Sequence, residues 1–381
     1  MTMNGNTMKF RPDGSFRLLQ VSDPQDMVHP RRAMINMLDR AYDALDPDLV
    51  VFTGDNILGN HLLDFGPFRI TDVGDPKVTL RQMRRSLRHI LLPLERRGIP
   101  FAMIYGNHDD MNDVSKQEQF RLYRAYGNCL PMNEDDPAVD CDTYNIPITG
   151  TDGRVKWNVY MLDSAWNDET GQHCRIKAET VRWYERTLDA LREENGGISP
   201  PSLMFLHVPL PQTEELCVPC GENDPGAVKT EKGFVRLDET KATGTLGEPV
   251  SPCEDPDGLF EAVQKGGDVR AVISGHDHAN CFDGETRGVR LIGTPAASFR
   301  CYGNSLRGVR LFILHENAPD AFDTRHYAYD DLCGSSFPAR VRYFRDADDL
   351  VKQKIAVLAS GAAVFAAGAA AAALSVKAKR R

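Results

Sequence analysis

The chain has 381 residues, of which 41% are hydrophobic and 26% are charged, and its formal net charge is −9. This composition excludes an intrinsically disordered chain, and the length allows one large domain or two average ones. Residues 352–381 carry six basic side chains and no acid, so the preceding part is more acidic than the total indicates, which excludes non-specific binding to a nucleic-acid backbone.

The first third of the chain alternates between predicted strands and helices. Residues 16–21, 49–52 and 101–104 are apolar runs of the kind that form buried strands. Residues 30–45 and 79–97 place apolar side chains on one face, at the spacing of an amphipathic helix. The order βαβαβ predicts a parallel sheet covered by helices.

The remainder of the chain contains more strands than helices. One further helix is predicted at residues 179–194. The last two predicted strands have hairpin-like spacing, so we expect a sheet-centred α/β core with an antiparallel finish. The predicted strands of this part are residues 157–162, 202–206, 269–273, 289–293 and 308–314.

Polar side chains that can bind metals follow most of these strands. Any one of the histidines is more often a core or surface residue than a ligand, but the repeated pattern favours the metal interpretation. Carboxylate, amide and imidazole groups together suit one or two divalent cations such as manganese, iron or zinc. Asp55 is the preferred bridge between two cations because Gly54 lets the backbone come close. The candidate ligands are Asp23, Gln25, Asp55, Asn107, His207, His276 and His278.

Residues 105–109 place an amide, an imidazole and a carboxylate on consecutive positions. Asn107 offers a neutral oxygen to a hard cation, His108 can move protons, and Asp109 can orient the imidazole. Gly-Asn is also an ordinary turn dipeptide, so this stretch depends on the other strand ends for its interpretation.

Five motifs in order resemble the calcineurin-like metallophosphoesterase superfamily, over residues 16 to about 315. Longer strings around residues 53–57, 105–110, 207–211 and 275–280 are similar to phosphatases akin to plant purple acid phosphatase twenty-nine and the yeast dosage-dependent cell cycle regulator. The five motifs are Asp23-x-Gln25, Gly54-Asp55-Asn56, Gly106-Asn107-His108-Asp109, His207 and Gly275-His276-Asp277-His278.

The resemblance implies a four-layer αββα sandwich of two mixed sheets over residues 1–350. Residues 212–256 are rich in glycine, proline and charge, which indicates a long lid or insert loop beside the site. The resemblance also implies hydrolysis of a phosphate ester, on a small phosphorylated substrate or a phosphoprotein, by a metal-bound hydroxide. His108 would be the general acid and Asp109 would steady it. Two divalent cations are implied, the first held by Asp23, Asp55 and His278 and the second by Asp55, Asn107, His207 and His276.

Two positions depart from the family pattern. Gln25 replaces the usual histidine of the first motif, and a neutral amide oxygen is a weaker ligand. Ile57 lies near the position where purple enzymes have a metal-bound tyrosine, so we expect no purple colour. The alternative function, motivated by Gln25, is a degenerate member that acts as a membrane-tethered binding scaffold.

Other chemically suggestive residues have plainer interpretations. Asp163 and Ser164 also end a strand and are expected to be a structural turn or a second layer around the site. Cys217 and Cys220 have C-x-x-C spacing, but only Cys253 lies nearby as a third thiolate, so free thiols are favoured over a structural zinc. Surface arginines are usually solvated charges, so phosphate contacts are not expected from Arg31, Arg300 and Arg307.

Residues 355–376 form a separate feature at the end of the chain. These 22 residues carry no charge and would measure about 33 Å as a helix, long enough to cross a bilayer. A membrane anchor is favoured over an alanine-rich helix that packs on the body. The first twenty residues lack an apolar signal segment and the nine cysteines are an odd number, so we expect a cytoplasmic body, anchored by this single C-terminal helix within residues 351–381.

Overall fold

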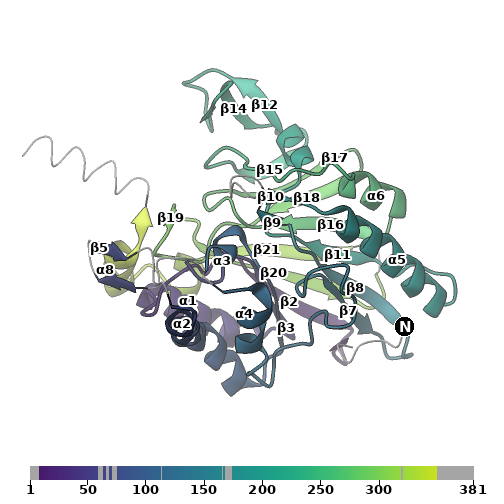
Figure 1. Cartoon of the computed structure of the whole chain (residues 1–381). Helices are drawn as coiled ribbons and strands as arrows, with labels where there is room; N and C mark the ends of the chain where they lie inside the picture. Colours follow the sequence, from purple (N-terminus) through teal and green to yellow (C-terminus); the bar gives the residue numbers. More distant parts are fainter. Residues whose placement is uncertain are drawn as a thin grey trace, which may run out of the picture.

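The computed structural model describes residues 8–58, 63–65, 68–70, 75–112, 114–164, 166–167, 174–318 and 321–349. Two mixed β-sheets form the centre of the molecule (Figure 1). The predicted C-terminal helix at residues 355–376 lies outside the described residues. Within the described part, no helix is both long and apolar enough to cross a membrane.

The smaller sheet has five strands in the order β21-β20-β2-β3-β6. The three strands that the sequence predicts first are parallel neighbours, whereas β20 runs antiparallel to β2 and β21 antiparallel to β20. This confirms the parallel start and the antiparallel finish of the expected core. The bounds are β2 Ser15–Val21, β3 Leu49–Thr53, β6 Phe101–Ile104, β20 Gly308–His315 and β21 Phe322–Ala328.

The larger sheet has eight strands in the order β1-β7-β8-β11-β16-β18-β17-β15. Strands β8, β11, β16 and β18 are parallel, and antiparallel strands flank them. The bounds are β1 Met8–Lys9, β7 Tyr144–Thr149, β8 Val155–Met161, β11 Ser202–Phe205, β16 Val269–Ser274, β18 Val289–Gly293, β17 Cys281–Thr286 and β15 Ala242–Thr245.

The hairpin expected from the last two predicted strands is wrong. β18 pairs with β16 and β17 in the larger sheet, whereas β20 pairs with β2 and β21 in the smaller one. The hairpin partner of β18 is β17, whose residues alternate between buried and more exposed positions, so it contains no apolar run.

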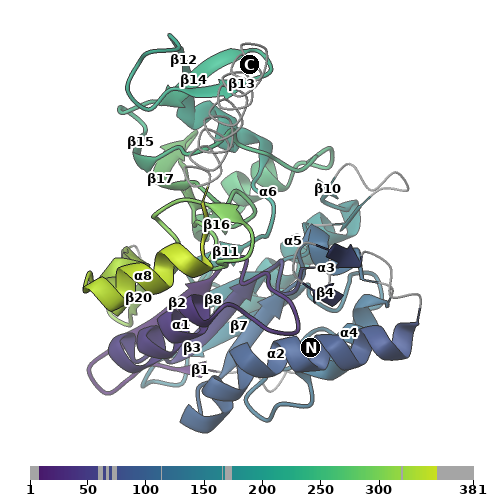
Figure 2. The ribbon, with the colours of Figure 1, turned by 90° about the vertical axis from the view of Figure 1, so that its left-hand side faces the viewer.

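Helices cover the outer faces of both sheets, so the layers are helix, sheet, sheet, helix, as Figures 1 and 2 show. α1 (Arg32–Leu45) and α2 (Pro76–Arg97) lie on the side of the smaller sheet, and α5 (Ala178–Glu194) and α6 (Leu259–Gly266) on the side of the larger one. The three predicted helices therefore exist, with ends shifted by no more than three residues.

The main core lies between the two sheets and continues under α1 and α2. Phe205 of β11 and Phe312 of β20 meet edge to face across it, with their ring centroids 5.7 Å apart. A second core packs α5 and α6 on the outer face of the larger sheet, where Tyr160 contacts Trp183 and Tyr184. Burial on both faces explains why the central strands read as continuous apolar runs.

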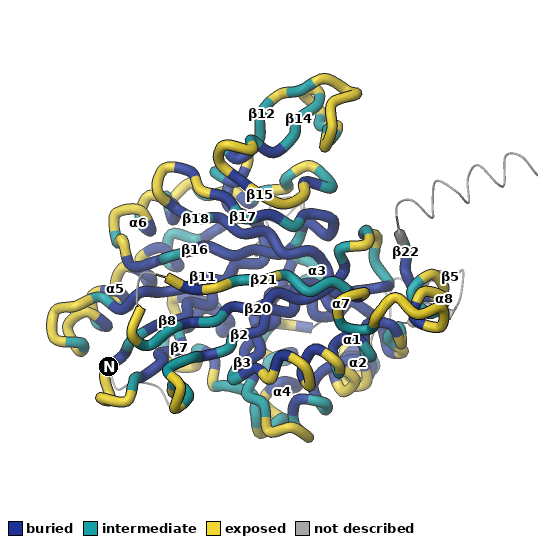
Figure 3. The backbone as a smooth tube through the Cα atoms, turned by 180° about the vertical axis from the view of Figure 1, so that it is seen from behind, coloured by how far each residue is buried: buried dark blue, intermediate teal, exposed yellow. Residues whose placement is uncertain are grey.

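Part of the predicted insert, residues 212–256, forms a separate small sheet that stands away from the body (Figures 1 and 3). A short 3₁₀ helix, Pro211–Leu216, leads into its antiparallel strands β12 (Cys217–Cys220), β14 (Gly233–Leu237) and β13 (Val228–Thr230). We call residues 217–237 the arm. The chain then returns to the body as edge strand β15.

Short elements complete the fold around the ends of the strands. They are β4 Leu63–Phe65, β5 Phe68–Ile70, α3 Asn107–Asp110, α4 Lys116–Tyr123, β9 Trp166–Asn167, β10 Cys174–Arg175, β19 Tyr302–Gly303, α7 Tyr329–Cys333, α8 Phe337–Asp346 and β22 Asp348–Asp349. β19 and β22 pair in parallel, which ties the last described residues to the body.

Candidate metal centre

The predicted metal ligands converge from the carboxyl ends of five strands that belong to both sheets. Asp23, Asp55 and Asn107 follow β2, β3 and β6 of the smaller sheet. His207 follows β11, and His276 and His278 follow β16, of the larger sheet. Because parallel strands end at one edge of a sheet, two facing sheets bring all six side chains to one place. We call these six residues the metal cluster.

The backbone at the strand ends is held in unusual conformations. Asp23, Asp55 and His276 have positive φ angles of 47°, 48° and 67°, which few residues other than glycine adopt. Such strain collects at functional sites, where the surrounding structure enforces it.

Two glycines are required because the strand ends approach so closely. A Cβ atom on Gly54, which has φ +89°, would lie 2.5 Å from Nδ1 of His207. A Cβ atom on Gly106 would lie 2.1 Å from Oδ1 of Asp55. Any side chain at either position would therefore push the candidate ligands apart.

Six side chains form two overlapping groups with Asp55 in both. Asp55, His207 and His276 have ligand atoms that all lie within 4.8 Å of one another, and the same holds for Asp23, Asp55 and His278. Asn107 joins the first group, because its Oδ1 is 3.0 Å from Nε2 of His207. The arrangement agrees with the two ligand sets that the resemblance implies.

Backbone carbonyls orient one histidine of each group, His207 in the first and His278 in the second. Nδ1 of His207 lies 2.9 Å from the oxygen of Thr53, and Nδ1 of His278 lies 3.1 Å from the oxygen of Tyr302. A carbonyl only accepts, so each Nδ1 carries the hydrogen. Each Nε2 is then left facing a carboxylate, as in ligating histidines.

The electrostatics of the metal cluster show a shortage of positive charge. Burial raises the pKa of Asp23 to about 7, and its Oδ1 is buried without a hydrogen-bond donor. Burial opposes a charge on His207, but Asp55 and Asp23 nevertheless raise its pKa to about 10. Burial lowers the pKa of His276 to about 3 and that of His278 to about 4. His276 and His278 are therefore neutral near pH 7, whereas His207 must release its Nε2 proton before it can bind a cation. Imidazole and carboxylate groups together are the donor set of divalent cations, so the residues present fit a metal site.

His108 lies beside the shared carboxylate. Its backbone N–H donates to Oδ1 of Asp55 over 2.9 Å, and its side chain is half-buried, with Nδ1 buried and without a hydrogen-bond partner. The expectation that Asp109 orients this imidazole is not what the structure shows. The Asp109 carboxylate instead accepts from the N–H groups of Gly106, Asn56 and Ile57, so it joins the loops after β3 and β6.

Gln25 turns its amide nitrogen toward the metal cluster. Nε2 donates to Oδ2 of Asp55 over 2.8 Å, while Oε1 accepts from the thiol of Cys301 over 2.6 Å. In this orientation Gln25 positions the shared carboxylate, and its amide oxygen does not face the metal cluster. Ligation of a metal by Gln25 stays a prediction, and Cys301 is a neighbour that no sequence motif indicated.

A second layer of contacts surrounds the ligands. The hydroxyl of Ser164 accepts from the N–H groups of His207 and Val208, which agrees with the supporting role expected for this residue. The ring of Tyr302 stacks on His278 at 4.5 Å, and its hydroxyl donates to Glu248. Glu248 comes from the segment after β15, so the end of the insert contacts a residue that packs on His278.

A second buried polar group lies next to α3. Nζ of Lys116, on α4, is 3.0 Å from Asp163, 3.7 Å from Asp110 and 4.0 Å from Asp142. Burial disfavours the ammonium charge, but the three carboxylates hold the pKa of Lys116 well above its usual range. We call these four residues the lysine cluster. Apart from the supporting role expected for Asp163, no feature of the sequence indicated this cluster.

Two of the three arginines considered as phosphate ligands, Arg300 and Arg307, have structural contacts. Arg307 is fully buried and donates to the carbonyls of Ser298, Cys301 and Asp348. Arg300 pairs with Asp26.

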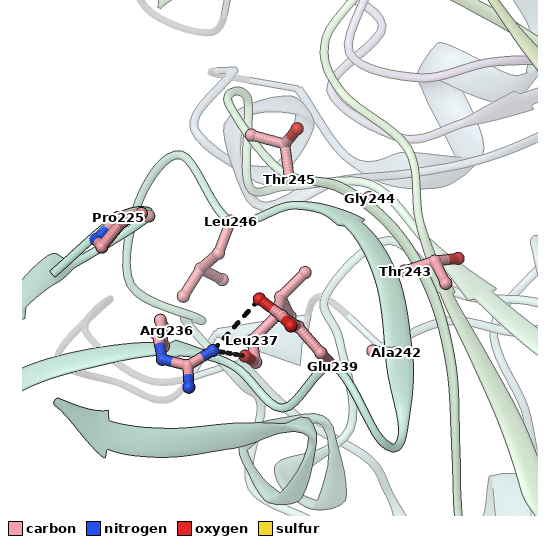
Figure 4. Close-up of a pocket in the computed structure, with 10 residues that line it drawn as sticks. Pro225, Arg236, Leu237, Glu239, Ala242, Thr243, Gly244, Thr245 and Leu246 are labelled. Atoms are coloured by element: carbon pink, nitrogen blue, oxygen red, sulfur yellow. Dashed lines mark hydrogen bonds and ion pairs between the residues drawn. The ribbon is translucent and has the colours of Figure 1, made fainter.

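The arm carries no candidate chemistry. Cys217 and Cys220 are free thiols on β12. Figure 4 shows a hollow of about 430 Å³ between the arm and β15, in which Arg236 contacts Glu239. None of the nine predicted site residues lines this hollow.

Comparisons with known proteins indicate a family for this chain. The model of the calcineurin-like phosphoesterase family matches residues 16–280. An Arabidopsis thaliana protein named probable inactive purple acid phosphatase 29 is 27% identical over 339 residues, which cover 80% of this chain and 77% of the plant protein. Phosphatase DCR2 of Saccharomyces cerevisiae is 24% identical and covers 70% of this chain and 41% of the yeast protein. The crystal structure of a Danio rerio dimetal phosphatase, 14% identical, aligns with 82% of this chain and 99% of its own, with a TM-score of 0.45.

Proposed function

Because the chain belongs to the calcineurin-like phosphoesterase family, we propose that it hydrolyses a phosphate ester with two divalent cations. The observation that supports this most is the pair of overlapping donor groups that share Asp55. When bound, two cations supply positive charge to the phosphoryl oxygens and activate a water molecule. Manganese, iron and zinc suit this mixture of imidazole and carboxylate ligands.

The side chains of the metal cluster divide between the two cations. Asp23, Asp55 and His278 would hold one of them. Asp55, Asn107, His207 and His276 would hold the other. Thr53 and Tyr302 fix the tautomers of two histidines, so the Nε2 atoms stay available without rearrangement.

His108 is the proposed proton donor to the leaving group. Its backbone bond to Asp55 supports this role, because Asp55 is the carboxylate shared by both donor groups. As the bond from phosphorus to the ester oxygen breaks, His108 gives its proton to the departing alkoxide. Asp109 holds the backbone of α3 in place against the loop after β3.

Hydrolysis of para-nitrophenyl phosphate by the full chain, reconstituted separately with manganese, iron and zinc, tests this proposal. We expect turnover with at least one metal. His108→Ala should lower kcat by about 10²–10⁴-fold at unchanged metal content. His315→Ala is the matched control, because His315 pairs with Asp323 at the surface and should leave kcat unchanged. Bound metal without turnover would contradict the proposal.

A binding scaffold is the second candidate function. It is motivated by the orientation of Gln25, which presents nitrogen where a metal ligand is expected, and by the name of the plant relative, which calls that protein inactive. Elemental analysis separates the two candidates. Absence of both bound metal and turnover after reconstitution would favour the scaffold.

We further propose that residues 355–376 anchor a cytoplasmic body to a membrane. The proposal rests on the sequence, which has 22 uncharged residues followed by a basic end. Flotation of the full chain with liposomes is the expected result. A chain that stays at the bottom of the gradient would contradict it.

A further inference from the structure

Helix α8 carries an apolar stripe on its outer face. Phe337, Val341 and Phe344 are 80%, 49% and 65% exposed. At about 100° per residue, their spacing of four and then three positions places them within about 60° of the helix circumference. The three side chains therefore leave a large apolar area exposed on one face of a ten-residue helix.

The orientation of α8 is fixed by its inner face. Tyr343 packs against Phe299 and Tyr329, and its hydroxyl donates to the carbonyl of Asn304. The carboxylate of Asp346 accepts from the N–H group of Ala33 at the start of α1. The stripe therefore points outward because of these contacts, and it cannot turn inward without breaking them.

Arginines border the stripe on both sides. By the same helical angles, Arg340 lies about 40° beyond Phe344, and Arg345 lies about 40° beyond Val341. Both are exposed, although Arg345 also contacts Asp346. Phenylalanine on one face with arginine at its borders is the pattern of helices that lie in a membrane interface.

The position of α8 in the chain points to the same partner. Helix α8 is followed by β22, and only five residues separate Asp349 from the uncharged segment that begins at residue 355. Such a link spans at most about 20 Å. If that segment enters a bilayer, the stripe is held close to the bilayer surface. Figure 3 shows the exposed outer side of α8 at the same end of the molecule as β22.

We propose that α8 lies on the surface of an anionic lipid bilayer, with its phenylalanines inserted among the lipids and its arginines at the phosphate groups. A second copy of the chain fits less well, since a symmetric contact would bring the arginines of two copies together. This inference depends on the proposed anchor only for the position of the bilayer. It does not depend on the proposed hydrolysis.

Tryptophan placed on the stripe tests the inference. The full chain with Phe344→Trp, and separately with Phe337→Trp, is reconstituted in vesicles of phosphatidylcholine with 30% phosphatidylserine. On binding to the vesicles, the fluorescence emission of the added tryptophan should shift to shorter wavelength. Most of this fluorescence should be quenched when the phosphatidylcholine carries bromine near the top of its acyl chains, because interfacial helices lie about 5–10 Å deep. Ile198→Trp is the control. Ile198 is 64% exposed beyond α5, and its added emission should remain unquenched.

Each other outcome overturns the inference in a recognisable way. Added emission that stays unquenched, while the protein floats with the vesicles, means that the anchor holds and α8 does not touch lipid. A shift to shorter wavelength without quenching means that another protein surface, such as a second copy, covers the stripe. A protein that does not float overturns both the anchor and the inference, and para-nitrophenyl phosphate turnover reports on the proposed hydrolysis independently.

Discussion

The metal cluster and the lysine cluster lie side by side and are built from similar acidic residues, but they differ in charge balance. In the lysine cluster the ammonium group of Lys116 lies within 4.0 Å of three carboxylates. In the metal cluster, no lysine or arginine of the described chain pairs with Asp23 or Asp55, and the only ionisable partners of these two carboxylates among the described residues are the imidazoles of His207 and His278. A buried carboxylate needs a compensating charge. The lysine cluster contains a permanent ammonium group, whereas the metal cluster has only the imidazole of His207 to carry a positive charge, and binding of a cation at Nε2 would displace that proton. We therefore expect bound cations to replace the imidazolium as the compensating charge.

Asp55→Asn tests this comparison most severely. Asparagine keeps the volume but removes the charge shared by both donor groups, so we expect loss of bound metal and a fall in turnover of more than about 100-fold, beyond the range for residues that only support a ligand. Without metal, the free energy of unfolding should fall only slightly, because the loss of the Asp55–His207 pair is partly offset by the relief of repulsion between Asp55 and Asp23.

Elemental analysis and urea unfolding in a chelator measure both effects of Asp55→Asn. Asp323→Asn, at an exposed position, should change neither. The comparison breaks if Asp55→Asn still binds two metal ions, or if it unfolds the protein.

Lys116→Met should affect stability strongly and metal binding little, the reverse of what we expect for Asp55→Asn. Removing one partner of a buried ion pair leaves uncompensated carboxylates, so the free energy of unfolding should fall by about 3–5 kcal/mol. Metal content should stay at its wild-type value under conditions where the variant is folded. Lys116→Arg keeps the charge and should lose less. A Lys116→Met protein as stable as wild type would show that the lysine cluster does not need its cation.

Cys301→Ala should have a smaller effect, a moderate loss of metal affinity. Without the thiol, Gln25 loses the donor that fixes its amide against Asp55. Support of this kind is typically worth 10–100-fold in metal affinity, and we expect a loss of about tenfold. Competition against a fluorescent chelator measures it. Cys301→Ser retains a donor and should recover part of the affinity, and Cys220→Ala on the arm is the neutral control. Equal affinities for all three variants would remove the role assigned to Gln25.

The grouping of these side chains was predictable from the sequence because each of them follows an apolar run that forms a strand, whereas their binding of metal stays a prediction. The chain direction of parallel strands then determines that Asp55, His207 and His276 meet. Asp109 was assigned to the wrong partner because adjacency in sequence does not tell which way a carboxylate points. Here three backbone N–H groups compete successfully for it.

Contacts between distant residues were not predictable. Lys116 and Asp163 are far apart in sequence, and each resembles an ordinary surface charge until the fold buries both. Strand β21 was missed for a related reason: it is an edge strand with partly exposed polar residues, so it lacks an apolar run. The expected hairpin failed because spacing alone does not reveal that β18 and β20 belong to different sheets.

The pairing of β19 with β22 sets a practical limit on how far the chain can be shortened. Asp348 accepts from the buried guanidinium of Arg307 and donates to Phe299, and its strand lies beside Tyr302, whose carbonyl orients His278. A truncated protein that stops after residue 351 removes the uncharged segment and keeps this pairing. A cut only a few residues earlier would remove one hydrogen-bond acceptor of Arg307 and would weaken the contact that orients His278. A fragment that ends there would therefore be a poor sample for metal titrations.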